Sequence, residues 1–280
     1  MTRSVLAHLT GLSSDRTVLD TAIAAARIGG GTVLALRTRI DIIGAAAALA
    51  VGLPNPTSNI QDSIADIRKE EAARAQHARE AYDEALKRHD ITNESLVKLS
   101  WEETRSLSST LLTLARYHDL TVMGREQELS AEQIRTVLMA SGRPLILAPP
   151  RPPSELGKIV AVAWKEGADA ARALTAAEPL LAGAQHVFIL AAVERGQNRE
   201  EVAKSANHLA AYFAAKGIKA GVRLSETDIG SHAIRDLAYE CDADLLVMGA
   251  YGHSRVREML LGGMTEAMLA DCAIPVFLFH

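Results

Sequence analysis

Short apolar runs alternate with longer helical segments along the whole chain. Short runs rich in Val, Ile and Leu are typical of buried strands, and apolar residues three or four positions apart predict amphipathic helices. Because several of these strands are apolar throughout, the pattern predicts an α/β fold whose parallel sheet is covered by helices on both faces. The predicted strands are 5–9, 32–36, 94–99, 120–123 and 145–148 in the first half, and 159–164, 186–192, 219–224, 245–248 and 276–279 in the second. The predicted helices include 18–27, 64–88, 107–117, 168–181, 199–216, 233–240 and 266–270.

The two halves are diverged copies of one unit. The segment Asp119–Gly124 (DLTVMG) recurs 125 residues later as Asp244–Gly249 (DLLVMG). The same offset aligns Leu99 with Leu224 without a gap, which predicts equivalent third strands. Closer to the start of each half the offset is 155, so the first half carries about 30 additional residues, at 38–62. We therefore expect two tandem open five-stranded parallel-sheet domains.

Proline marks the boundary between these domains. Residues 149–153 read PPRPP, a stiff connector that neither a helix nor a central strand accommodates. We predict a first domain at 1–148, a Pro-rich linker at 149–156 and a second domain at 157–280. The segments 144–148 and 275–279 are equivalent terminal strands, and they would be association-prone apolar edges if unpaired. We expect them to pair within the chain, and a further homodimer remains open.

Composition and charge narrow the class of partner. The net charge is −4 and neither half is basic, so we expect no nucleic-acid binding. Two cysteines cannot form a disulfide framework, and no signal peptide is evident, so the sequence predicts a cytoplasmic protein. The apolar run 42–53 is shorter than the roughly 20 residues of a membrane span. It predicts a helix packed on the domain, with a hairpin that contacts a partner or a membrane as the alternative.

Glycines cluster after the fourth strand of the second half. In open α/β sheets, ligands lie beyond the carboxyl ends of the strands, where the strand order reverses. Gly249 and Gly252 begin the cluster, and Gly262 and Gly263 lead into a predicted helix whose amino terminus favours anions. The pattern predicts a phosphate-binding loop, although paired glycines also occur in ordinary turns.

The segment 242–280 resembles the carboxyl-terminal signature of the universal stress protein family, Gly-x2-Gly-x9-Gly-Ser/Thr. Gly249, Gly252 and Gly262 match its three glycines. The resemblance implies two nucleotide α-hydrolase-like, Rossmann-like domains, with pairing through the last strand. It also implies that ATP or another adenine nucleotide binds over the glycine loop of the second half. The implied site residues are Val162, Ala163, Trp164, Met248, Gly249, Tyr251, Gly252, His253, Gly262, Gly263, Met264 and Thr265.

The chain departs from the family pattern at two positions of the second half. Gly263 stands where the signature has Ser or Thr, and Thr265 matches a further family hydroxyl two residues later. Trp164 stands where nucleotide-binding members end the first strand with Asp. A tryptophan at this position stacks on a base or fills the cleft.

The first half departs further from the pattern and predicts a degenerate, structural domain. It keeps Gly124, but residues 125–128 (REQE) replace the glycine turn and six residues are missing from the loop. We therefore expect a regulatory stress-response protein with a nucleotide site in the second half alone. Two alternatives remain: a scaffold whose cleft Trp164 closes, and a slow ATPase. The sequence offers no convincing general base or metal-ligand set, which disfavours an enzyme.

Overall fold

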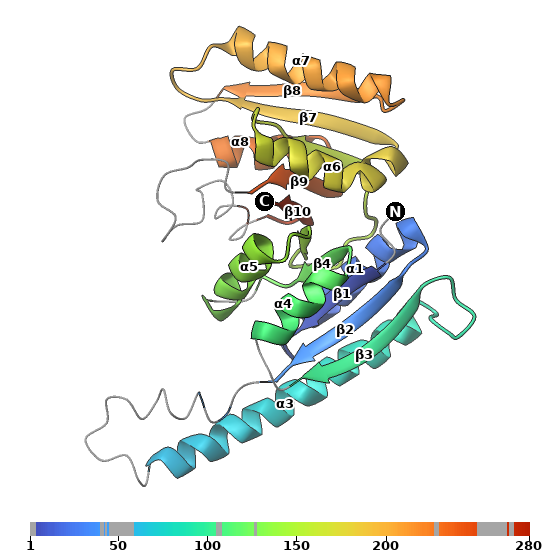
Figure 1. Cartoon of the computed structure of the whole chain (residues 1–280), viewed down its shortest axis with the longest axis vertical. Helices are drawn as coiled ribbons and strands as arrows, with labels where there is room; N and C mark the ends of the chain where they lie inside the picture. Colours follow the sequence, from blue (N-terminus) through green and yellow to red (C-terminus); the bar gives the residue numbers. More distant parts are fainter. Residues whose placement is uncertain are drawn as a thin grey trace.

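The computed structural model describes residues 4–39, 42, 44, 59–104, 108–125, 128–226, 230–250, 268 and 272–280. Within these residues the strands form one ten-stranded sheet in the order β3-β2-β1-β4-β5-β10-β9-β6-β7-β8. The two halves lie one above the other along the long axis of the molecule (Figure 1). The strands of the first half are β1 (Ser4–Leu9), β2 (Thr32–Thr38), β3 (Lys98–Thr104), β4 (Leu120–Met123) and β5 (Leu145–Leu147). Those of the second are β6 (Ile159–Ala163), β7 (His186–Val193), β8 (Ala220–Glu226), β9 (Leu245–Gly249) and β10 (Val276–Phe279).

Helices cover both faces of this sheet, as the apolar strands predicted. The bounds are α1 (Asp15–Gly29), α3 (Asn59–Arg88), α4 (Ser108–Tyr117), α5 (Glu128–Ala140), α6 (Ala168–Gly183), α7 (Arg199–Ala215) and α8 (Gly230–Glu240). One buried cluster joins residues of α1, α3, α6 and α7, and a second joins residues of α4, α5 and α8. Alternate residues of β1 enter the two clusters, because successive side chains of a strand point to opposite faces.

The two halves meet through their last strands. β5 and β10 pair antiparallel, with Ile146 opposite Phe277, while the other strand pairs are parallel. This confirms the predicted pairing of 144–148 with 275–279. Each half has five strands in equivalent order, so the predicted fold class is confirmed, and the two sheets join into one.

The repeat offset of 125 holds for the strands next to the centre of each half. Leu120 of β4 pairs with Val5 of β1, and Leu245 of β9 pairs with Val160 of β6. These four residues occupy equivalent places in the two copies.

The predicted position of the third strand was wrong by about four residues in the first half. β3 begins at Lys98, whereas the sequence predicted a strand at 94–99. The strand pairing makes Leu99 equivalent to Ala220, not to Leu224. Because side chains alternate with a period of two, a shift of four preserves which residues face inward, so the hydrophobic pattern does not detect it.

The repeated aspartate that begins the DL-x-VMG motif has a structural role. The carboxylate of Asp244 accepts hydrogen bonds from the backbone N–H groups of Gly157, Lys158 and Ile159, at 2.6, 2.9 and 3.0 Å. Burial raises the pKa of Asp244, and the three hydrogen bonds act in the opposite direction. Asp119 accepts from the Ser4 N–H at 3.1 Å in the same way. Each aspartate therefore ties the start of the fourth strand to the start of the first.

α3 begins at Asn59 and its first turns extend beyond the sheet (Figure 1). Its middle covers the side chain of Arg37, which is 1% exposed and lies between the carboxylates of Glu71 and Glu103. Arg39 also contacts Glu103, at 2.9 Å. These ion pairs hold α3 against β2 and β3. Most of the additional segment 38–62 lies outside the described residues, and so does its predicted packing.

No helix within the described ranges is both long enough and apolar enough to cross a membrane.

Candidate functional site

The carboxyl ends of β6 and β9 lie side by side at the reversal of strand order in the second half. Val162 pairs with Val247, so Ala163 and Met248 follow at adjacent strand ends. Val162 and Met248 are buried, and Ala163 is partly buried. The structure therefore brings together Val162, Ala163, Met248 and Gly249, which the sequence predicted for a nucleotide site, and places them where open α/β sheets bind ligands.

Gly249 allows the amino terminus of α6 to approach this strand end. A Cβ atom at residue 249 would lie 2.7 Å from the backbone N of Ala170 and 2.7 Å from the carbonyl carbon of Asp169. Gly124 has the same role in the first half, where a Cβ atom would lie 2.2 Å from Oγ of Ser14. The repeated glycine thus has a packing reason in both halves, independent of any ligand.

Trp164 continues from β6 and is held by a short chain of hydrogen bonds. Its indole Nε1–H donates to Oγ of Ser205 on α7 at 3.0 Å. The Ser205 hydroxyl in turn donates to a carboxylate oxygen of Glu166 at 2.8 Å. The ring is partly buried and packs against the cluster formed by α6 and α7. Sequence reasoning identified Trp164 but not Ser205 and Glu166, because the contact joins residues about 40 positions apart.

The remaining predicted residues belong to the glycine loop. Tyr251, Gly252, His253, Gly262, Gly263, Met264 and Thr265 lie outside the described residues. Within the predicted helix 266–270, Met268 is described, and it is helical and buried. The glycine loop therefore stays a prediction from the sequence.

In the first half, the loop between β1 and α1 is closed by the protein itself. The carboxylate of Asp15 is buried and accepts hydrogen bonds from the N–H groups of Thr10 and Gly11, both at 2.8 Å. Gly11 has φ +79° and lies directly against the backbone of Arg74 in α3. The Asp15 carboxylate thus accepts hydrogen bonds from backbone N–H groups of the loop between β1 and α1. The sequence analysis missed Asp15, although an acidic residue in the first turn of a helix is a known signal for such contacts.

His8 lies at the end of β1, next to this closed loop. Its imidazole is 2% exposed and its Nε2 lies 2.9 Å from Oγ1 of Thr38. Burial lowers the pKa of His8 to about 4, so the ring is neutral at physiological pH.

This pKa predicts a loss of stability in mild acid. The unfolded chain binds a proton near pH 6.5, whereas the folded chain resists protonation until about pH 4, so stability is full above pH 6.5 and falls below it. The free energy of unfolding should decrease by about 2 kcal/mol from this group between pH 7 and pH 5. Urea denaturation at both pH values, followed by circular dichroism, measures it. His8→Gln should lose this part of the pH dependence, and an unchanged dependence would show that His8 is not its source.

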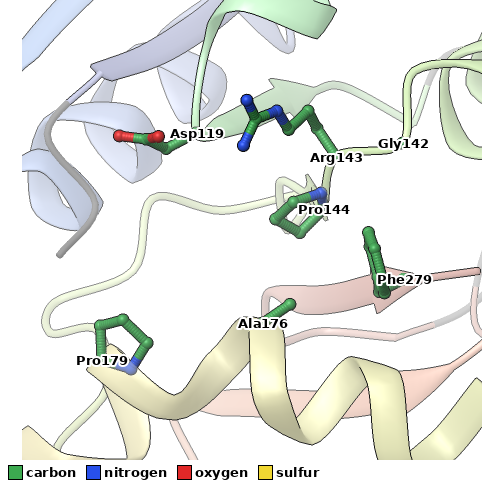
Figure 2. Close-up of a pocket in the computed structure, with 7 residues that line it drawn as sticks. All are labelled: Asp119, Gly142, Arg143, Pro144, Ala176, Pro179 and Phe279. Carbon is green, nitrogen blue, oxygen red and sulfur yellow. The ribbon is translucent and has the colours of Figure 1, made fainter.

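A cavity of about 240 Å³ lies between the two halves. Figure 2 shows Asp119, Arg143 and Pro144 of the first half on one side of it, and Ala176, Pro179 and Phe279 of the second half on the other. Its two charged side chains already form hydrogen bonds within the first half. Asp119 accepts from the N–H of Ser4, and Arg143 donates to the carbonyl of Arg116. The cavity lining includes none of the predicted nucleotide-site residues.

The second half is similar to a known protein family. Residues 157–280 match the model of the universal stress protein family. The universal stress protein Slr1230 of Synechocystis is 40% identical over 65 residues, which cover 22% of this chain and 23% of that protein. The match thus spans about a quarter of the length of this curated relative.

Solved structures share the fold over the whole chain. A universal stress protein from Archaeoglobus fulgidus has a TM-score of 0.65 at 18% identity, covering 100% of this chain and 96% of that one. A functionally unknown protein from Pseudomonas aeruginosa has a TM-score of 0.60 at 13% identity, with 99% and 92% covered. A protein described as a putative universal stress protein, also from Pseudomonas aeruginosa, has a TM-score of 0.59 at 15% identity, with 99% and 93% covered. These similarities cover both halves of the chain, so the two halves together share the fold of these proteins.

Proposed function

We propose that the second half of this chain, which matches the universal stress protein family over residues 157–280, binds an adenine nucleotide such as ATP. The observation that carries the proposal is that β6 and β9 end side by side, with Gly249 against the start of α6 and with Trp164 following the last residue of β6 in the chain. In general, an aromatic ring suits a nucleotide base and a helix amino terminus suits a phosphate group. The glycine loop predicted from the sequence follows Gly249 directly.

The site belongs to the second half alone. In the first half the Asp15 carboxylate accepts hydrogen bonds from the N–H groups of the loop after β1. A phosphate bound there would be repelled by its negative charge. The packing of Gly124 on Ser14 and of Gly249 on Asp169 makes Ala170 the equivalent of Asp15. Alanine has no carboxylate, and the acidic residue in the first turn of α6, Asp169, pairs with Arg172. We propose that residues 1–148 serve as a structural domain and residues 157–280 as the ligand-binding domain, joined by the linker 149–156.

The proposed role is regulatory: nucleotide binding reports a cellular state to protein partners in a cytoplasmic stress response. A scaffold without nucleotide is the second candidate, and one observation favours it. The indole N–H of Trp164 already bonds to Ser205, so the ring is held against α7 in the free protein. In that case the chain acts through protein contacts alone.

Nucleotide titration distinguishes the two candidates. We expect a dissociation constant in the micromolar range for ATP by calorimetry, equivalent to roughly −8 kcal/mol. The variant Trp101→Phe leaves Trp164 as the single tryptophan, and its fluorescence emission should shift when ATP is added. In that background Gly252→Val should abolish the shift, since a branched side chain crowds the approach of a phosphate to the backbone.

A matched variant controls for general effects of a new side chain. Gly183 ends α6, and a Cβ atom there would meet nothing within 4 Å beyond its neighbouring residues and the nearby backbone of α6, so Gly183→Val should keep the fluorescence response. Absorbance and chromatography of the denatured protein would reveal nucleotide retained through purification. No heat at millimolar ATP, together with unchanged emission, would instead support the scaffold. Release of phosphate during the titration would indicate a slow ATPase.

A further inference from the structure

The cavity between the two halves lies where the pairing of β5 with β10 ends. The pairing reaches Leu145 on β5, which lies opposite Leu278 on β10. The next residues outward, Pro144 and Phe279, both line the cavity of about 240 Å³. Proline has no N–H group with which to continue the ladder, so the pairing of the two strands stops at this point. The cavity is therefore bounded by residues of both halves.

The first half contributes one positive and one negative side chain to the cavity. Arg143 and Asp119 lie on the same side of it (Figure 2). A guanidinium has five N–H donors, and Arg143 uses its Nε–H on the carbonyl of Arg116 at 3.2 Å. Within the part of the chain that the structure describes, no ion pair involves Arg143. Its terminal nitrogens therefore give this side of the cavity donors for an anionic group, next to the negative charge of Asp119.

The second half contributes an apolar side. Ala176 and Pro179 are three positions apart on α6, so they lie on one face of that helix. Together with Phe279 they face the first half across the cavity (Figure 2). The volume of about 240 Å³ is below the roughly 300–1,000 Å³ of pockets that hold drug-sized ligands, so the cavity suits a smaller molecule.

The internal repeat does not require the charged and aromatic lining. An offset of 131 residues aligns Pro144 with Pro275, as the pairing of Ile146 with Phe277 also shows. The same offset places Ile274 at the equivalent of Arg143, and Ala148 at the equivalent of Phe279. Both of these residues pack in the buried clusters. The guanidinium and the aromatic ring thus belong to this cavity and not to the shared architecture of the two copies.

We propose that this cavity binds a free α-amino acid with an apolar side chain, such as leucine. Arg143 pairs with the carboxylate of the ligand, and the negative charge of Asp119 attracts its ammonium group. The ligand side chain lies against Ala176, Pro179 and Phe279. A simple carboxylic acid would be repelled by Asp119 and a simple amine by Arg143, whereas a zwitterion complements both charges.

Such a ligand bridges the two halves, because its charged groups contact the first half and its side chain contacts the second. The cavity lining includes none of the predicted nucleotide-site residues, so this site is separate from the proposed nucleotide site.

Calorimetry with L-leucine and three analogues tests the ligand class. We expect a dissociation constant of roughly 0.1–1 mM for leucine, as suits so small a ligand. Glycine lacks the apolar side chain, 4-methylpentanoate lacks the ammonium group, and 3-methylbutylamine lacks the carboxylate. Each analogue should bind at least about tenfold more weakly than leucine. No heat at about 20 mM leucine, or equal binding of 4-methylpentanoate, would overturn the proposal.

Arginine substitutions at two positions test the charged side of the cavity. Arg143→Gln should weaken leucine binding by about 10- to 100-fold, the usual effect of losing a charge-assisted hydrogen bond. Arg125→Gln is the matched control. The Arg125 guanidinium also lies at the junction of the halves, where it donates to the carbonyls of Cys272 and Ile274, but it does not line the cavity. The control should bind leucine as the unmodified chain does, and equal losses in the two variants would contradict the site.

A pair of substitutions on α6 tests the apolar side. Ala176→Phe should fill the cavity and abolish leucine binding without changing a charge. Thr175→Phe adds the same ring at the preceding, exposed position, which does not line the cavity, and it should keep the binding. Circular dichroism establishes that both variants are folded. A folded Ala176→Phe variant that binds leucine as tightly as the unmodified chain would show that the ligand lies elsewhere.

Discussion

Replacing Arg37 with methionine should lower the free energy of unfolding by about 3–5 kcal/mol, the usual cost of removing one partner from a buried ion pair. The Arg37 side chain is 1% exposed, and its two terminal nitrogens contact Glu71 and Glu103. Methionine fills a similar volume but leaves both carboxylates without this partner beneath α3. Urea denaturation at pH 7, followed by circular dichroism, measures the loss.

Arg39→Met is the matched control for this prediction. Arg39 contacts the same Glu103 carboxylate, but its side chain is 41% exposed. Solvent screens an exposed pair, so the expected loss is below about 1 kcal/mol. Equal losses for the two variants would show that the burial of Arg37 does not decide its contribution.

The stability loss in Arg37→Met should depend on pH, because Arg37 contacts the carboxylate of Glu103. The hydrogen bond from Arg39 and the contacts with Arg37 lower the pKa of Glu103 below its ordinary value of 4.5. A depressed carboxylate pKa stabilises the fold above about pH 4.5, and this stabilisation disappears as the pH falls through the folded-state pKa. The difference between Arg37→Met and the unmodified chain should therefore shrink below about pH 4.5.

Replacing Gly11 with alanine should cost about 4 kcal/mol, because the new Cβ atom causes two separate problems. Gly11 has φ +79°, a conformation that alanine adopts only with strain. The Cβ atom would also lie 2.2 Å from the carbonyl oxygen of Arg74, an overlap with backbone that no side-chain rotation relieves. We expect the first half to lose the packing of α3 on the loop after β1.

Substitutions at three other glycines separate the cost of backbone strain at positive φ from the cost of Cβ overlap. Gly142 has φ +66° and nothing within 4 Å of a Cβ atom, so Gly142→Ala should cost about 1 kcal/mol from strain alone. Gly249→Ala should cost about 2–3 kcal/mol from overlap with α6 alone. Gly183→Ala has neither problem and should leave stability within a few tenths of a kcal/mol. Thermal and urea unfolding of the four variants measures the series, and a Gly11→Ala cost no larger than that of Gly142→Ala would contradict the overlap with α3.

The order of strands and helices followed from the sequence because it depends on local patterns. The buried strands at 120–123 and 276–279 coincide with β4 and β10, since continuous apolar runs have few alternatives to a covered parallel sheet. The repeat was visible because Asp244 and Gly249 each have a packing reason that both copies share. Pairing of the last strands followed from their equivalence and their apolar edges.

The tertiary structure decided what depends on residues far apart in the chain. The place of β3 needed strand pairing, because an alternating edge strand tolerates a shift of four residues without changing its faces. The closed loop at Asp15 and the orientation of Trp164 needed the contacts that α3 and α7 make after folding. Arg125 was visible in the sequence as a departure from the glycine turn, but its partners lie about 150 residues away in the other half. The sequence by itself thus determined the fold class and the repeat, and it predicted the region of the candidate site, because these arise from local hydrophobic and glycine patterns. Only the tertiary structure decided which charged and polar side chains form hydrogen bonds within each half and between the halves, because hydrogen bonds between distant segments leave no periodic signal in the sequence.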